Sequence, residues 1–137
     1  MTWHILGAGS LGCLWAARLA AQQQSVHLVL RNPDSIASYQ QTPGVALSDA
    51  SRQHSHHYPV SAQLADHPQP IDKLLLACKA YDAEAAIAQV AHRLGQHSLV
   101  ILLQNGLGSQ QAIQAQLPTV RCIAASTTEG AYLAEPF

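Results

Sequence analysis

The feature that most constrains this chain is a glycine-rich turn between an apolar strand and a helix, close to the N-terminus. Residues 2–6 form a short apolar run, residues 7–12 read Gly-Ala-Gly-Ser-Leu-Gly, and a second apolar run follows at 26–30. Between the two apolar runs, the residues that would share one face of a helix are Leu11, Leu14, Trp15, Arg18 and Leu19. A strand, a Gly-x-Gly-x-x-Gly turn, a helix and a second strand are typical of the phosphate-binding βαβ unit of a Rossmann-type domain. The alternative is a structural glycine turn without a ligand.

Each glycine of this turn has its own mechanical reason. Gly7 lets the chain turn sharply out of the strand, and Gly9 lacks a Cβ, so a pyrophosphate can approach the backbone. Gly12 lets the helix pack close against the strand. The first turn of the helix then offers unpaired N–H groups and a partial positive charge to phosphates.

Arg31 follows the second strand directly, where an NAD site usually carries Asp or Glu. The first acidic residue after this strand is Asp34. A carboxylate at the strand end would repel a 2′-phosphate, whereas a guanidinium pairs with it in a bidentate manner. The sequence therefore favours NADP(H) over NAD(H). The alternative is that Arg31 is an ordinary exposed arginine in a loop.

The composition limits the classes of partner and the compartment. A net charge of −1 gives no electrostatic case for nucleic acid or an anionic membrane. The cysteines lie in apolar segments and are typical of reduced thiols in a cytoplasmic protein; they are Cys13, Cys78 and Cys122. We see no signal segment, and no apolar run approaches the roughly 18 residues that cross a bilayer. We therefore expect a cytoplasmic protein.

Three histidines within residues 54–57 raise the question of a metal site. They lack Cys or carboxylate partners at ligand spacing and lie in a polar, serine-rich stretch. The sequence favours an exposed loop without a metal.

Beyond Arg31, apolar runs alternate with helical repeats. We expect strands at 71–78, 98–103 and 120–125, and helices at 36–41, 82–94 and 109–117, with Gly95 capping the second helix. Residues 45–47 and 58–60 are candidate edge strands whose pairing stays open. This alternation predicts an α/β fold with a doubly wound, mostly parallel sheet, as a single domain over residues 1–137.

Two polar residues directly follow apolar strands of this predicted sheet. Lys79 follows residues 74–78, and Asn105 follows residues 100–104. In such sheets ligands bind beyond the carboxyl ends of the strands, so both side chains would border the crevice near a nicotinamide. A lysine can bind a carboxylate or polarise a carbonyl, and an amide can donate and accept. The alternative is a solvated lysine and an asparagine that only shapes the turn before Gly106.

The chain resembles the N-terminal domain of the ketopantoate reductase (2-dehydropantoate 2-reductase) family. The motifs that carry the resemblance are the 7–12 turn with Arg31, Leu-Ala-Cys-Lys79-Ala-Tyr, Leu-Gln-Asn105-Gly-Leu-Gly, and Ser-Thr-Thr-Glu-Gly-Ala at 126–131. They span nearly the whole chain in family order. The resemblance implies an enzyme that reduces ketopantoate to pantoate with NADPH, on the route to pantothenate and coenzyme A.

The same resemblance implies roles for individual residues. The pyrophosphate would be held by Gly7, Ala8, Gly9, Ser10, Leu11 and Gly12, and the 2′-phosphate by Arg31. Lys79 and Asn105 would face nicotinamide and substrate, and Ala131 would contact the cofactor through its backbone. The hydroxyls of Ser126, Thr127 and Thr128 would lie near the site.

The chain departs from the family by ending at Phe137, whereas family members continue into a helical domain that supplies the lysine thought to act as general acid. We expect the N-terminal part of a two-domain enzyme, inactive alone and prone to self-association through the uncovered interdomain face. The alternatives are a related NADP-dependent 2-oxo acid reductase, or a non-catalytic nucleotide-binding or redox-sensing module.

Overall fold

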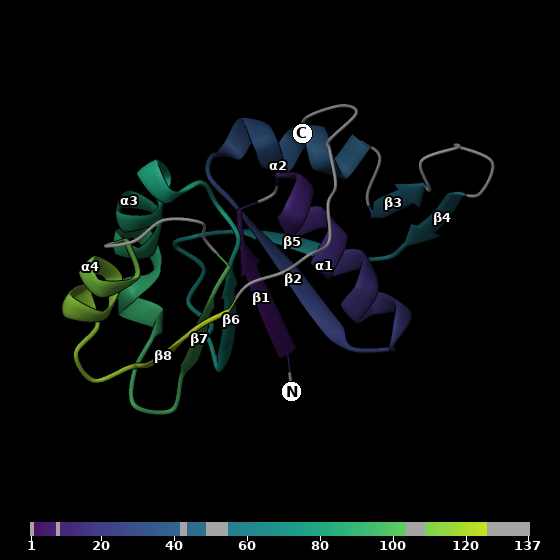
Figure 1. The fold of residues 1–137 in the computed structure, drawn as a ribbon. Coiled ribbons are helices and arrows are strands. Elements are labelled where there is room, and N and C mark those ends of the chain that lie inside the picture. Colours follow the sequence, from purple (N-terminus) through teal and green to yellow (C-terminus); the bar gives the residue numbers. More distant parts are fainter. Residues whose placement is uncertain (1, 8, 42–43, 49–54, 104–108, 126–137) are drawn as a thin grey trace.

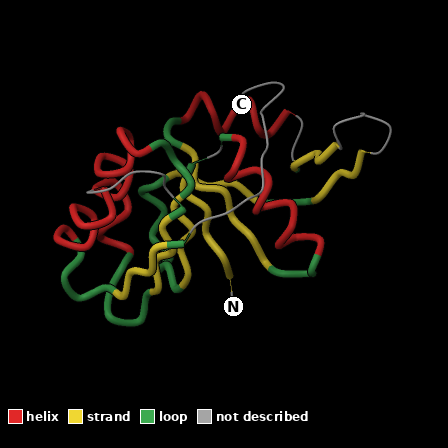
Figure 2. The backbone as a smooth tube through the Cα atoms, in the orientation of Figure 1, coloured by secondary structure: helices red, strands yellow, loops and turns green. Residues whose placement is uncertain are grey.

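The computed structural model describes residues 2–7, 9–41, 44–48, 55–103 and 109–125 (Figures 1 and 2). Its strands are β1 (Thr2–Leu6), β2 (Ser25–Leu30), β3 (Val45–Ser48), β4 (Ser55–Tyr58), β5 (Ser61–Leu64), β6 (Lys73–Leu76), β7 (Leu99–Leu102) and β8 (Arg121–Ala124). Its helices are α1 (Ser10–Ala21), α2 (Pro33–Gln41), α3 (Ala80–Val90) and α4 (Ser109–Gln116), with a 3₁₀ turn at Ala91–Arg93.

Six parallel strands form one sheet in the order β5-β2-β1-β6-β7-β8, with β1 and β6 at its centre. Helices α3 and α4 lie side by side on one face, and α1 and α2 lie on the other (Figure 1). Because β1 leads into a helix on one face and β6 into a helix on the other, the direction of winding changes between these two strands. The predicted doubly wound, parallel α/β sheet is confirmed.

Alternate residues of the central strands feed two separate cores. Ile5, Leu28 and Leu75 pack toward α1, while Leu6, Leu74 and Leu76 pack toward α3 and α4. Strands buried on both faces must be apolar at successive positions, which explains the continuous apolar runs in the sequence. Both cores depend on these strands, so the sheet holds the two helical layers together.

The buried face of α1 differs from the predicted one. Only Leu14 of the predicted stripe is buried, whereas Leu11, Trp15 and Leu19 are half-exposed and Arg18 is exposed. The helix instead presents small side chains to the sheet, namely Cys13, Ala16 and Ala17. Small residues let the helix axis lie close to β1 and β2, which leaves the larger side chains at its flanks.

Residues 42–70 differ most from the sequence prediction. The predicted loop is wrong for His56 and His57, which are exposed as predicted but belong to β4 and pair with β3. His54 lies outside the described residues. The predicted strand at 58–60 is also displaced, since β4 ends at Tyr58 and β5 begins at Ser61. Only β5 joins the main sheet, because β3 and β4 form their own antiparallel pair. Pro59 separates the two strands and has no N–H with which to continue a ladder.

Several helix boundaries also move. Helix α2 begins at Pro33, because the Asn32 side chain accepts a hydrogen bond from the Ser35 amide (2.9 Å) and caps the first turn. Helix α3 begins at Ala80 rather than 82 and gives way at Ala91 to the 3₁₀ turn, whose C-cap is Leu94 rather than Gly95.

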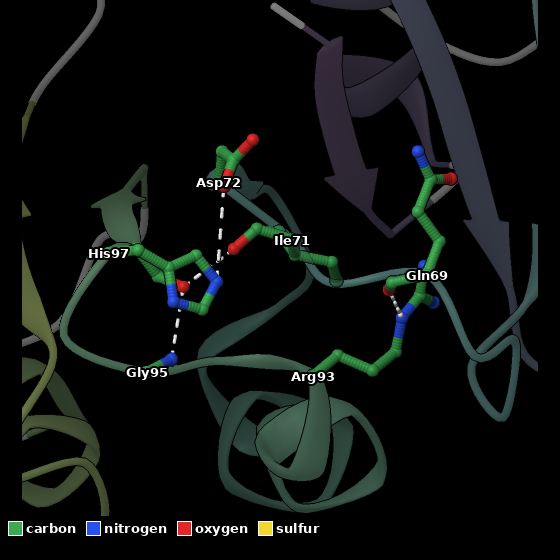
Figure 3. A network of polar contacts seen from close by, with 7 residues as sticks. Gln69, Ile71, Asp72, Arg93, Gly95 and His97 are labelled. Carbon is green, nitrogen blue, oxygen red and sulfur yellow. Dashed lines mark hydrogen bonds and ion pairs between the residues drawn. The ribbon is translucent and has the colours of Figure 1, made fainter.

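A buried arginine ties the end of this 3₁₀ turn to the chain that follows β5. Arg93 is 3% exposed, and its Nε donates to the Gln69 carbonyl (2.8 Å) (Figure 3). Its other nitrogens donate to the Leu64 and Ala65 carbonyls and to the Gln63 side chain. Nearby, Ser98 Oγ donates to the Ile71 carbonyl (2.5 Å) and accepts from the Gly95 amide (3.0 Å). The Ser98 bonds lie at the amino-terminal ends of β6 and β7, whereas the Arg93 side chain reaches the carboxyl end of β5.

Two histidines lie in the same region of the sheet. His4 of β1 and His27 of β2 are cross-strand neighbours, with ring centroids 5.2 Å apart. The pKa of His4 is lowered to about 4, mainly by burial and then by the positive charges of Arg93, His27 and His67, while Asp72 opposes the shift. Burial, followed by His67 and Arg93, also lowers the pKa of His27. The folded chain therefore holds His4 neutral in mild acid.

We predict that the chain loses stability in acid because of His4. The unfolded chain takes up a proton near the ordinary pKa of 6.5, whereas folded His4 does so only near 4, so stability falls as pH drops between these values. The loss expected from this group is about 2–3 kcal/mol. Urea unfolding at several pH values should show it in wild type and in the exposed control His92→Gln, and should show a smaller loss in His4→Leu. Equal acid loss in all three proteins would contradict the assignment.

Candidate functional site

The carboxyl ends of β2, β1 and β6 place three sequence-predicted residues side by side. In the order of the strands, Arg31 follows β2, Gly7 follows β1, and Lys79 lies three residues beyond the end of β6. The β1–β6 ladder extends one residue past the strands, because the Ala77 amide donates to the Leu6 carbonyl (3.0 Å). The change of winding direction falls between β1 and β6, and such a switch point is where open α/β sheets bind ligands.

Gly7 and Gly12 are required by close packing at this edge. Gly7 has φ +107°, and a Cβ there would lie 2.8 Å from the Cys78 amide nitrogen and 3.1 Å from the Ala77 carbonyl carbon. A Cβ on Gly12 would overlap the Gly7 carbonyl oxygen. The sharp turn at Gly7 and the close packing of the helix at Gly12 are thus what the sequence predicts.

Gly9 is different, because a Cβ there would meet no atom within 4 Å. It is the N-cap residue of α1, and its carbonyl accepts the first helical hydrogen bond from the Cys13 amide (3.0 Å). No side chain caps this helix end, and its first turn holds no acidic residue. Open space over uncapped N–H groups fits a bound phosphate. The residues that the structure describes at this turn therefore suit a pyrophosphate.

Two cations flank the glycine turn. Arg31 is exposed at the end of β2, and Lys79 is exposed as the N-cap residue of α3, with its carbonyl accepting from the Asp82 amide (2.9 Å). Next to Lys79, Tyr81 is 83% exposed. The site therefore presents positive charge on both sides of the open space at Gly9.

The Cys78 thiol lies among these charges and is half-buried. Burial raises its pKa, the Asp82 carboxylate raises it further, and the Arg31 guanidinium lowers it. Cys78 and Asp82 had no predicted role at the site. Their sequence positions could have indicated them, because Cys78 follows the strand that leads to Lys79 and Asp82 lies in the first turn of the helix after it.

Several predicted site residues lie outside the described residues: Ala8, Asn105, Ser126, Thr127, Thr128 and Ala131. The side chain of Ser10 is likewise not described, while Leu11 is half-buried in the first turn of α1. The chain does leave β7 at the same edge, since the Leu103 amide donates to the Leu76 carbonyl (3.0 Å). The pairing of Lys79 with Asn105 therefore stays a prediction.

Other features of the described residues do not compete with this site. A cavity of about 330 Å³ lies between α2 and β5 and is lined by Ile36, Tyr39, Gln40, Val60, Ser61 and Ala62, none of them predicted to bind cofactor. Within the described ranges, no group of three metal-ligating side chains is found. No helix in that part of the chain is long and apolar enough to cross a membrane.

Comparisons with known proteins show the family of this chain. A family model described as ketopantoate reductase PanE/ApbA matches residues 3–137. The 2-dehydropantoate 2-reductase of Vibrio cholerae serotype O1 is 30% identical over 127 residues, which cover 93% of this chain and 39% of the relative.

Solved structures show the same relationship. A PanE/ApbA family ketopantoate reductase from Ralstonia eutropha has a TM-score of 0.84 at 28% identity, covering 99% of this chain and 44% of the other. The ternary structure of D-mandelate dehydrogenase with NADH and anilino(oxo)acetate has a TM-score of 0.87 at 20% identity, covering 99% and 43%, and shares the fold. The chain thus spans less than half the length of these proteins.

We predict opposite consequences for alanine at Gly12 and Gly9. Gly12→Ala should destabilise the chain by about 3 kcal/mol or more, because the methyl group overlaps a backbone oxygen that cannot move freely. Gly9→Ala should cost no more than about 1 kcal/mol, since the methyl group enters open space at an ordinary φ of −80°. Chemical denaturation of both variants measures the difference, and similar losses would show that the turn is not packed as described.

Proposed function

The chain belongs to the ketopantoate reductase family, and we propose that it forms the NADPH-binding part of an enzyme that reduces ketopantoate to pantoate. The observation that carries this proposal is the open space at Gly9, above the uncapped start of α1 and between two cations. We propose that the 7–12 turn binds the pyrophosphate there. Because the chain covers 39% of the length of the Vibrio cholerae relative, the complete reaction is proposed for a longer enzyme.

Arg31 supports NADP(H) as the cofactor. It is exposed at the end of the strand next to β1, so its guanidinium is free of the core and can reach a 2′-phosphate beside the glycine turn. A bidentate guanidinium–phosphate pair is among the stronger charge-assisted contacts. A carboxylate at the end of β2, which would favour NAD(H), is absent from this chain.

Lys79 is proposed to act on the substrate. The cofactor supplies a hydride, whose addition to the 2-oxo carbon leaves an alkoxide that a general acid must protonate. The exposed ammonium of Lys79 can bind the substrate carboxylate or stabilise charge on that oxygen, and Asn105 is proposed to orient the same group. We propose that the general acid lies in the part of a longer enzyme that this chain does not cover.

A second candidate is the reduction of a different 2-oxo acid. D-mandelate dehydrogenase, which shares the fold, was solved with NADH and anilino(oxo)acetate. The residues around Gly9 and Lys79 would serve either substrate, because phosphate binding and carboxylate binding do not depend on the substrate's side chain.

Exchanging Arg31 for aspartate should weaken the binding of NADPH much more than the binding of NADH. Arg31→Asp removes the charge-assisted pair and puts a like charge beside the 2′-phosphate, so NADPH binding should weaken by about 1–3 kcal/mol. NADH binding should change much less, because NADH lacks this phosphate. Fluorescence titration of both reduced cofactors into both proteins measures the effect. Equal weakening of the two cofactors would separate Arg31 from the 2′-phosphate.

The chain alone should bind NADPH but should not reduce ketopantoate at a useful rate. It holds the glycine turn and Arg31, whereas the wall that excludes water and orients the substrate belongs to the longer enzyme. Its exposed apolar side chains, Tyr81 (83%) and Ile123 (47%), should also favour self-association, which light scattering would detect. A fluorescence titration with NADPH and a ketopantoate-dependent absorbance assay decide the matter. Absence of NADPH binding would overturn the proposed function, and rapid turnover would overturn the need for a further domain.

A further inference from the structure

Asn32 lies at the proposed cofactor edge, and the proposed function gives it no role. It follows Arg31 directly after β2 and precedes the first residue of α2. Its side-chain oxygen accepts a hydrogen bond from the Ser35 amide (2.9 Å), and its carbonyl accepts one from the Ile36 amide (3.3 Å). Asn32 therefore caps the start of α2, and the cap bond fixes the direction of its carboxamide group.

The cap bond also determines which atoms of Asn32 are left for a ligand. The carboxamide is planar, with its oxygen turned toward the Ser35 amide and its nitrogen, Nδ2, on the other side. Nδ2 carries two N–H donors, and no acceptor binds them in the part of the chain that the structure describes. Since Asn32 is an exposed residue, a bound molecule can reach these donors.

The position of α2 separates Asn32 from the proposed pyrophosphate site. Helix α2 packs against β5 and β2, and the Tyr39 hydroxyl donates to the Val60 carbonyl just before β5. Strand β2 lies between β5 and β1, so the chain that follows Arg31 turns away from β1 and from the glycine turn after it. Consecutive Cα atoms are about 3.8 Å apart, so Asn32 stays beside Arg31. Asn32 is thus placed next to the 2′-phosphate that Arg31 is proposed to bind, on the adenosine side of the cofactor.

The residues that follow Asn32 offer this phosphate little else. Pro33 has no N–H, Asp34 carries a carboxylate, and the Ser35 amide is already bound to the Asn32 side chain. A phosphate monoester has three terminal oxygens, and a bidentate guanidinium pairs with two of them. The Nδ2 group of Asn32 is the neighbour of Arg31 that can donate to a further oxygen.

We propose that Asn32 is a specificity-determining residue, whose Nδ2 donates to the 2′-phosphate of NADPH beside the Arg31 guanidinium. This inference rests on the proposed function, because it presumes a nicotinamide cofactor bound at the glycine turn. A hydrogen bond to a charged phosphate oxygen is stronger than one between neutral groups. NADH has an uncharged hydroxyl at this position and gains less from the same donor. Asn32 thus adds to the preference for NADPH that Arg31 is proposed to create.

Helix capping provides variants that separate the two uses of the Asn32 side chain. Asn, Asp and Ser are about equally good N-caps, so Asn32→Asp and Asn32→Ser keep the start of α2 while removing the Nδ2 donors. Asn32→Ala removes both the cap and the donors. Gln41 is exposed at the other end of α2, so Gln41→Glu is a matched control that exchanges an amide for a carboxylate far from Arg31.

The experiment measures Kd for NADPH and for NADH with the wild-type chain and the four variants, by nicotinamide fluorescence at low and at high salt. Asn32→Ser should weaken NADPH binding by about three- to tenfold. Asn32→Asp should weaken it by more than about tenfold at low salt and by less at high salt, because its carboxylate repels the phosphate and salt screens the repulsion. NADH binding should change by less than about twofold in both variants, and Gln41→Glu should keep the wild-type ratio of the two constants. Thermal unfolding should show a loss of stability in Asn32→Ala but not in Asn32→Ser.

An unchanged ratio of the two constants in Asn32→Ser would overturn the inference, and a ratio changed only in Asn32→Ala would show that Asn32 acts through the cap alone. Equal weakening of both cofactors would overturn it as well, as would the same change of ratio in Gln41→Glu. These results leave the proposed function in place, provided that the wild-type chain binds NADPH and Arg31→Asp weakens that binding selectively. A wild-type chain that binds neither cofactor would overturn the proposed function and this inference together.

Discussion

The rest of the site depends on the close contact between the glycine turn and the start of the chain after β6. Gly7 lies so near the Cys78 backbone that a side chain would not fit, and Gly12 lies against the Gly7 carbonyl. These two contacts bring the start of α1 and the start of α3 to the same edge of the sheet, from opposite faces. A larger residue at either contact would move a helix, and with it every group that borders the site.

Polar side chains are used in two different ways in this fold. Arg93 and Ser98 use their polar atoms on backbone carbonyls inside the protein, and the buried His4 stays neutral. At the carboxyl ends of the central strands, the start of α1 has no side-chain cap, and Arg31 and Lys79 are exposed. The first set of polar groups is paired within the fold, whereas the second set is accessible to a ligand.

The chain belongs to the ketopantoate reductase family, and the family's proposed reaction needs more than cofactor binding. A Rossmann-type domain supplies charge recognition for a dinucleotide, which acts through a few fixed donors and cations. Hydride transfer requires in addition that water is excluded and that the reacting carbon is held in line, and this takes a second wall. The chain spans 39% of the length of the Vibrio cholerae relative, and we propose such a second wall for a longer enzyme.

The sequence by itself determined the parallel α/β class, the place of the glycine turn and the strand ends that carry Arg31 and Lys79, because each depends on local pattern. Apolar runs, helical repeats and glycines act over a few residues and are legible in one dimension. Only the tertiary structure decided that α1 packs through Cys13 and Ala16 rather than through its larger side chains, and that β3 and β4 pair apart from the main sheet. It also decided that Asp82 and Arg31 act on one thiol, although 51 positions separate them in the chain. Such placements depend on which strands become neighbours, and strand order is set by the packing of the whole sheet rather than by any local segment.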